Sequence, residues 1–130
     1  MTYRVKNWDK HYEKAQTRRC EKMSWVAIPN KHDGKGFRRV ARHERSVELF
    51  TAWILIVQVA SKMPVRGLLV DDDGPLDAED MADKTGFPAE IFHLAFPVLV
   101  EAKIGWLERV AGDGIVPDSE SARSALGAES

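Results

Sequence analysis

Positively charged side chains gather in the first third of this chain of 130 residues. Residues 1–45 hold 13 Lys and Arg against 5 Asp and Glu, whereas residues 46–130 hold 6 against 15, so the formal net charge of −1 hides a basic and an acidic segment. A basic cluster of this kind is typical of a surface that binds nucleic-acid phosphates. It is equally compatible with a basic segment that packs against the acidic part of the same or a neighbouring chain.

The candidate phosphate contacts in the basic segment are all Lys or Arg. They are Lys6, Lys10, Lys14, Arg18, Arg19, Lys35, Arg38, Arg39 and Arg42. The last three fall in residues 37–43, where one or two helical turns would put Phe37, Val40 and Ala41 on the side opposite the arginines. Such contacts position DNA without reading its sequence. The alternative for all of them is a solvated face or ion pairs with the acidic residues.

Other residues capable of chemistry lack the spacing that the chemistry needs. The run Asp71 to Gly74 places Gly too early for a calcium loop, and residues 33–36 lack the length and the Lys-Ser/Thr ending of a phosphate-binding loop. The four histidines and Cys20 show no paired zinc-ligand spacing, and Cys20 would need a neighbouring base to act as a nucleophile. We therefore expect a non-enzymatic protein with no metal and no cofactor.

The four tryptophans are expected mainly in the core or against a sheet. Trp8 and Trp25 lie in the basic segment, however. Stacking on the bases of single-stranded DNA is therefore an open alternative for these two side chains.

The longest apolar stretch, Ser46 to Met63, predicts the helix around which the other elements pack. Two adjoining apolar stripes recur along it at helical spacing. They are formed by Val47, Phe50, Ile54 and Val57 and by Leu49, Trp53, Ile56 and Ala60. We expect Ser46 to cap the helix, with Glu48 in the first turn, Lys62 in the last, and Pro64 beyond the end. The run between Glu48 and Lys62 is shorter than the about 20 residues that span a membrane.

Two further helices are expected after this one. Residues 67–70 predict a short strand and residues 71–75 a turn, and Asp77 then caps a helix that Gly86 closes. The next helix runs from Pro88 to Lys103. Its apolar stripe consists of Ile91, Leu94, Ala95, Val98 and Leu99, and Pro97 inside it predicts a kink or an early end. The chain continues with a strand at 104–110, a Gly-rich turn at 111–114 and a strand at 115–116.

This order of elements, helix, strand, helix, tight turn, helix, strand, turn and strand, is that of a winged helix-turn-helix domain. The sequence thus predicts an α+β fold that is mostly helical, with the winged-helix domain at residues 46–116. Residues 1–45 would form a basic N-terminal extension packed on that domain, opening with a strand at 3–8. Residues 117–130 are small and polar, which predicts a disordered tail.

A family resemblance is carried by the opening residues RVKNWDKHYE and by residues 67–108, GLLVDDDGPLDAEDMADKTGFPAEIFHLAFPVLVEAKIGWLE. They are similar to the N-terminal winged-helix domain of phage-type replication proteins, related to replisome organisers and DnaD-like primosome components. In that family an Asp-Gly pair precedes the second helix and an Ile-Gly-Trp-Leu-Glu stretch opens the wing. Here these are Asp73-Gly74 and residues 104–108, and the resemblance covers about residues 3–110.

The resemblance implies DNA binding through the second helix of the helix-turn-helix pair. That helix offers His93 and Lys103 as candidate contacts beside Glu90 and Glu101, with no Arg, Asn or Gln to read bases. We therefore expect a DNA-binding protein of phage or prophage type, in replication or its control, that contacts DNA chiefly through the basic segment. The alternative is a winged-helix module for protein interaction or dimerisation, with the apolar and acidic surface at residues 87–96 as its interface.

The location of the protein is indicated by two features of the sequence. Cys20 is the only cysteine, and the N-terminal residues lack the apolar core of a signal peptide. We expect a reducing, cytoplasmic location without a membrane partner. The partner is then DNA, bound without sequence preference, or a protein, which includes a second copy of the chain.

Overall fold

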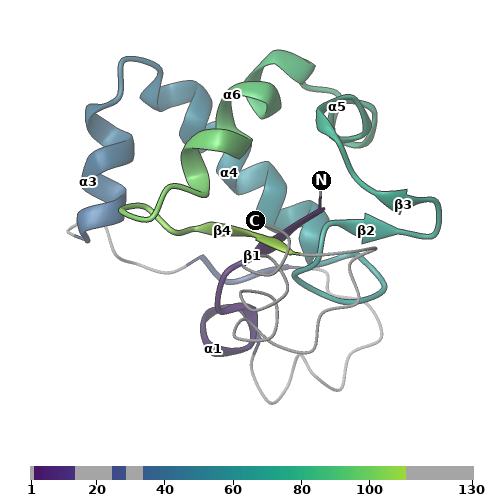
Figure 1. Ribbon diagram of the computed structural model, residues 1–130. Helices are drawn as coiled ribbons and strands as arrows, with labels where there is room; N and C mark the ends of the chain where they lie inside the picture. The colour runs from purple at the N-terminus through teal and green to yellow at the C-terminus, as the bar shows by residue number, and fades with distance from the viewer. Residues whose placement is uncertain (1, 14–24, 29–33, 111–130) are drawn as a thin grey trace, which may run out of the picture.

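Five helices and four short strands make up the described part of the chain, which is residues 2–13, 25–28 and 34–110 of the computed structural model (Figure 1). The helices are α1 (Trp8–His11), α3 (Lys35–Arg42), α4 (Ser46–Ala60), α5 (Ala78–Thr85) and α6 (Ala89–Leu99). The strands are β1 (Thr2–Val5), β2 (Val70–Asp71), β3 (Gly74–Pro75) and β4 (Leu107–Val110). About half of the described residues are helical, and the predicted α+β class is confirmed.

Strand β1 has hydrogen-bonding partners on both of its edges. On one edge it pairs antiparallel with β4, with Val5 opposite Leu107. On the other edge the amide of Val5 donates to the carbonyl of Gly67 at 2.7 Å, and the amide of Leu69 donates to the carbonyl of Tyr3 at 2.9 Å. The first residues of the chain therefore form the middle of a small sheet.

The predictions for the first and the last strand of the chain are confirmed in part. The N-terminal strand expected at residues 3–8 ends at Val5, and Trp8 begins α1 instead. The strand expected at residues 104–110 is shorter, and its partner within the described residues is β1. The expected turn at 111–114, the strand at 115–116 and the tail at 117–130 lie outside the described residues.

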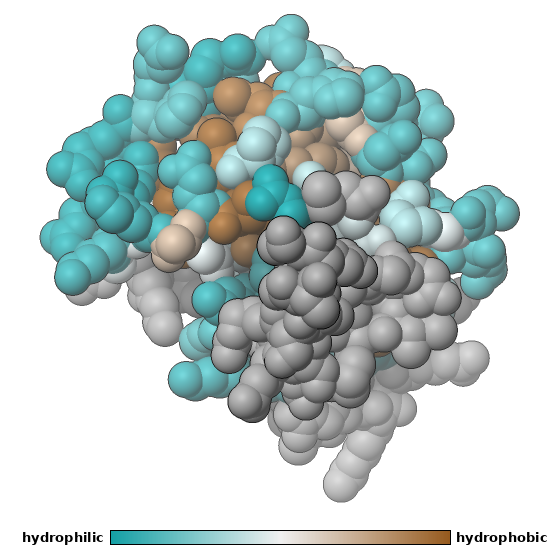
Figure 2. Space-filling model, viewed as in Figure 1, coloured by the Kyte–Doolittle hydropathy of each residue, from teal (hydrophilic) through white to brown (hydrophobic). Residues whose placement is uncertain are grey.

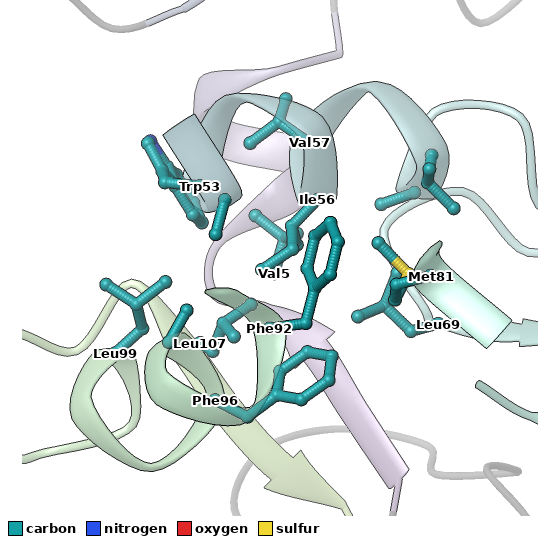
Figure 3. Close-up of a cluster of buried hydrophobic side chains, with 14 of the residues drawn as sticks. Val5, Trp53, Ile56, Val57, Leu69, Met81, Phe92, Phe96, Leu99 and Leu107 are labelled. Carbon is teal, nitrogen blue, oxygen red and sulfur yellow. The ribbon is translucent and has the colours of Figure 1, made fainter. Parts of the chain in front are cut away.

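Helix α4 lies at the centre of the hydrophobic core, as predicted. The stripe with Leu49, Trp53 and Ile56 is buried along its whole length (Figure 3). The other stripe is buried only toward its C-terminal end, because Val47 is 75% exposed and Phe50 is 37% exposed. The predictions for the helix ends are confirmed for Glu48 in the first turn and for Pro64 beyond the end, and are wrong for Ser46 and Lys62.

Ser46 is the first helical residue of α4, and Arg45 occupies the N-cap position without a side-chain hydrogen bond. The helix ends at Ala60, so Lys62 lies beyond its last turn. Both helix ends differ from the prediction because backbone turns close the helix. The amides of Lys62 and Met63 donate to the carbonyls of residues 59 and 60, which tightens the chain before Pro64.

Helix α5 has the ends that its sequence predicts. The Asp77 side chain accepts a hydrogen bond from the Asp80 amide at 2.8 Å, and the Asp80 side chain accepts one from the Asp77 amide at 3.0 Å. This is a reciprocal capping box. Gly86 closes the helix with a left-handed φ of 79°, which favours Gly because it has no Cβ.

Helix α6 begins one residue later than expected, at Ala89, and ends at Leu99 rather than at Lys103. Pro97 lies inside the helix, where it has no amide to donate to the carbonyl of residue 93, and the helix ends two residues after it. The helix buries more than the predicted stripe. Phe92 and Phe96 face the core between α4 and the β1–β4 pair, and the Phe96 ring stacks on Tyr3 with centroids 4.4 Å apart (Figure 3).

The segment after β1 is fixed to the rest of the domain by Trp8 and Glu13. The Trp8 ring stacks on Tyr12 with centroids 4.9 Å apart, and its indole N–H donates to the Glu13 carboxylate at 3.1 Å. Glu13 is almost fully buried and pairs with Arg66 at 3.2 Å. Burial also raises the pKa of the Tyr12 hydroxyl well above its ordinary value, so that it stays protonated.

The close contact between Gly67 and Trp8 predicts a large effect of a single methyl group. Gly67 has a φ of 91°, and a Cβ at this position would lie 2.6 Å from the Trp8 side chain. We expect Gly67→Ala to lower the free energy of unfolding by about 2 kcal/mol or more, measured by urea denaturation. Gly86→Ala is the matched control, because the φ of Gly86 is also positive but a Cβ at this position would meet no neighbouring atom within 4 Å. Its loss should be about 1 kcal/mol, and equal losses would contradict the predicted clash.

The capping box predicts a pH dependence that reports on Asp77. The hydrogen bond from the Asp80 amide is the main cause of a pKa of the Asp77 carboxyl below its ordinary 3.8. A lowered folded-state pKa stabilises the fold above about pH 4, and this contribution is lost as the pH falls through the folded-state pKa. Asp77→Asn keeps the hydrogen-bond acceptor but does not titrate. We expect the difference in Tm between the wild type and Asp77→Asn to shrink in favour of the variant as the pH is lowered. A difference in Tm that does not change with pH would contradict this prediction.

Candidate nucleic-acid interface

Helix α3 presents an arginine face to solvent. Its opposite side packs on α4, with Val40 buried and the Phe37 ring against Phe50 at a centroid distance of 5.8 Å. The predicted helix at residues 37–43 is thus confirmed. Arg38, Arg39 and Arg42 are all exposed, whereas Ala41, which was expected on the packed side, is also exposed.

The arginine face, meaning Arg38, Arg39 and Arg42, forms no ion pair within the described ranges. Among the described residues, these guanidinium groups form one hydrogen bond, from Arg42 Nε to the Arg38 carbonyl at 3.3 Å. Each guanidinium therefore retains donors for a carboxylate or phosphate ligand.

Many of the acidic residues lie at the other end of the molecule, in the β2–β3 hairpin and α5, whereas Glu44 and Glu48 closely follow α3 in the chain. In Figure 1, α3 is on the left, the β2–β3 hairpin and α5 are on the right, and α4 and α6 lie between them. Asp71 forms an ion pair with Lys84 at 3.2 Å. Its pKa is lowered first by the hydrogen bond from the Asp73 amide and then by Lys84. Asp71 is thus satisfied locally, and among the described residues no carboxylate of this hairpin or of α5 forms an ion pair with the arginine face.

Of the other Lys and Arg candidates, four lie in the described part of the chain and three do not. Lys6, Lys10, Lys35 and Lys103 are exposed, and Lys6 lines a cavity together with Gly36 and Phe37 at the start of α3. Lys14, Arg18 and Arg19 lie outside the described residues. Continuity between the arginine face and Lys14 is therefore still a prediction.

Helix α6, the candidate recognition helix, has its polar side chains joined to its neighbours. Glu90 accepts a hydrogen bond from Arg45 at 2.7 Å, and His93 lies 2.9 Å from Glu79 of α5. Arg45 also binds Glu48 at 2.8 Å, and this hydrogen bond is the main cause of a lowered pKa of Glu48. The helix thus presents no group suited to base reading, in line with its composition.

A cavity of about 690 Å³ adjoins α3 and was missed by the sequence analysis. Its aromatic lining includes Phe37, Trp53 and Trp106, and the two indoles lie 5.0 Å apart. These rings come from distant parts of the chain, so no local spacing indicates the cavity. Of the tryptophans expected as stacking candidates, Trp8 is buried and unavailable to DNA, whereas Trp25 is 61% exposed.

Because the arginine face forms no ion pair with any described residue, we predict that it contributes little to stability. We expect Arg38→Ala/Arg39→Ala to change the free energy of unfolding by no more than about 0.5 kcal/mol, because no folded-state contact of their charges is lost. Glu13→Gln should lower it by about 2 kcal/mol or more, because it removes a nearly buried carboxylate charge that lies 3.2 Å from the partly buried Arg66. Both are measured by urea denaturation. A large loss in the double variant would assign the arginines a structural role.

Three comparisons with known proteins, covering family models, curated proteins and solved structures, find no match to this chain. In residues 2–13, 25–28 and 34–110, no three His, Cys, Asp or Glu side chains are grouped so that they could hold a metal ion. None of the helices in these ranges has the length and apolar character needed to cross a membrane. The case for a function therefore depends on the arrangement of charges and aromatic rings described above.

Proposed function

We propose that this protein is a non-enzymatic DNA-binding protein that contacts the phosphate backbone through the arginine face of α3. The observation that carries the proposal is the exposure of Arg38, Arg39 and Arg42 without an ion-pair partner in the described chain. Three cations held close together on one helix repel one another unless a polyanion or salt neutralises them.

Arginine suits this role because its planar guanidinium donates two parallel hydrogen bonds to a phosphate. Lys35 on the same helix and Lys6 beside the adjoining cavity extend the positive surface. Contacts of this type are made to the backbone, so binding has little sequence preference. We expect α6 to contribute little, because Glu90 and His93 are engaged with Arg45 and Glu79.

We further propose that the scaffold is a winged helix of the phage replication type. In support, α5 and α6 are joined by only three residues, 86–88, and α6 is followed by β4 of the small sheet. The resemblance of residues 67–108 to such proteins supports a place in DNA replication or its control. The proposed DNA contact differs from that of the family, because it uses α3 instead of the second helix of the pair.

A protein-interaction or dimerisation module is the second candidate. Figure 2 shows hydrophobic residues gathered over α6 and surrounded by hydrophilic ones, and Phe87 at the turn before α6 is 44% exposed. The expected interface at residues 87–96 is nevertheless reduced, because Phe92 and Phe96 are buried in the core. We rank this candidate second, since an apolar face of this kind does not explain the arginine face.

The proposal predicts DNA binding that weakens steeply with salt. Fluorescence anisotropy of labelled single- and double-stranded DNA, titrated with the protein over a salt series, measures both affinity and the number of phosphate contacts. We expect micromolar affinity at low salt. Arg38→Ala/Arg39→Ala should weaken binding and reduce the slope of log K against log salt by about 1 to 2, because two phosphate contacts are lost.

Lys62→Ala/Lys84→Ala is the matched control, because it removes the same charge outside the arginine face. Lys62 is exposed beyond α4, and Lys84 binds Asp71 on the acidic side. The control should leave the salt slope unchanged. Equal effects of the two double variants would indicate a response to net charge alone. No binding at low salt by the folded protein would contradict the proposal and favour the protein-interaction candidate.

A further inference from the structure

The cavity of about 690 Å³ lies between the start of α3, the middle of α4 and the turn before β4. Phe37 comes from α3, Trp53 from α4, and Trp106 from the turn. The centroid of each ring lies within 6.4 Å of the centroid of another ring of the cavity. The volume falls within the range of pockets that hold small organic ligands. Trp53 is 4% exposed, whereas Phe37 and Trp106 are partly exposed, so the aromatic walls open to a ligand are those of Phe37 and Trp106.

The polar groups at the cavity are positive or neutral. Among its described lining residues, Lys6 and His11 are the titratable side chains other than Tyr12, and no Asp or Glu is present. The first residues of α3, including Gly34 and Gly36, also line it, so backbone N–H groups of a helix N-terminus lie at its edge. Aromatic walls with a positive edge are complementary to a planar ring that carries a negative group.

The chain is packed closely at this point because Gly36 has no side chain. A Cβ on Gly36 would lie 3.0 Å from Trp106 Nε1 and 3.0 Å from the carbonyl oxygen of Ile104. The glycine thus lets α3 approach the turn before β4. Phe37 lines the cavity, and Arg38 and Arg39 are the next two residues of α3, so the cavity and the arginine face lie on different sides of one helix, which is about 10 Å across.

We propose that this cavity takes one unpaired base of single-stranded DNA, while Lys6 and the arginine face hold the phosphates on either side of that base. The inference depends on the proposed function and extends it by naming the form of DNA that is bound. Stacking of bases on aromatic side chains is the usual means by which proteins hold single strands without sequence preference.

Single-stranded DNA fits this surface better than a duplex or a free nucleotide does. In a duplex the bases are stacked inside and do not reach a pocket without being unpaired. A free nucleotide would occupy the cavity but would leave Arg38, Arg39 and Arg42 unused, since these residues do not line it. A strand supplies both the base for the cavity and further phosphates for the arginine face.

The test compares three labelled ligands by fluorescence anisotropy at one salt concentration. They are a thymidine oligonucleotide, an oligonucleotide of the same length whose central residues are abasic, and a duplex of the same length. We expect the abasic strand and the duplex to bind roughly tenfold or more weakly than the thymidine strand, because the stacked base is lost. Equal affinity for the thymidine and abasic strands would overturn the inference and leave the proposed function intact.

Substitutions within and beside the cavity locate the effect. Phe37→Leu keeps an apolar side chain on α3 but removes the flat ring, so it should reduce the preference for the thymidine strand over the abasic strand. Val47→Ala is the control, because Val47 is 75% exposed on α4 and does not line the cavity. An unchanged preference in Phe37→Leu, with folding verified by circular dichroism, would also overturn the inference. Absence of binding to all three ligands would contradict the proposed function itself.

Discussion

The position of β1 between β4 and residues 67–69 is the constraint on which the rest of the structure depends. Because β1 has hydrogen-bonding partners on both edges, its register fixes where the following residues lie. Lys6 and Asn7 then reach the edge of the aromatic cavity, and Trp8 fits against Gly67. The basic N-terminal residues and the core helices therefore share one hydrophobic core, which includes Val5 and Trp8.

The paired charges of the described residues fall into two classes with different physical roles. The pair of Glu13 and Arg66 is largely shielded from water, so removal of either charge takes away an attraction that water does not replace fully. The more exposed pairs, Lys84 with Asp71 and His93 with Glu79, stabilise the fold less, because water and salt screen them. The arginine face belongs to neither class. Its charges lack partners within the described chain, so stability does not account for their presence on α3.

Much of the fold could be predicted because its signals are local. The apolar run of α4, the cap at Asp77 and the glycine at position 86 each act within a few residues, and the structure has them as expected. The pairing of β1 with β4 joins residues about 100 positions apart, and no local pattern specifies it. The aromatic cavity was missed for the same reason, since it forms only when Phe37 and Trp106 meet.

The separation of charge explains how a protein with a net charge of −1 presents a surface suited to a polyanion. Helices α4 and α6 lie between α3 and the acidic end formed by α5 and the β2–β3 hairpin (Figure 1). Each helix is about 10 Å across with its side chains, whereas the Debye length at physiological salt is about 8 Å. The field at the arginine face is thus set by α3 and its neighbours, and the distant carboxylates oppose a phosphate there only weakly. Net charge is then a poor guide to binding, because an approaching strand responds to the charges within a Debye length of its own phosphates.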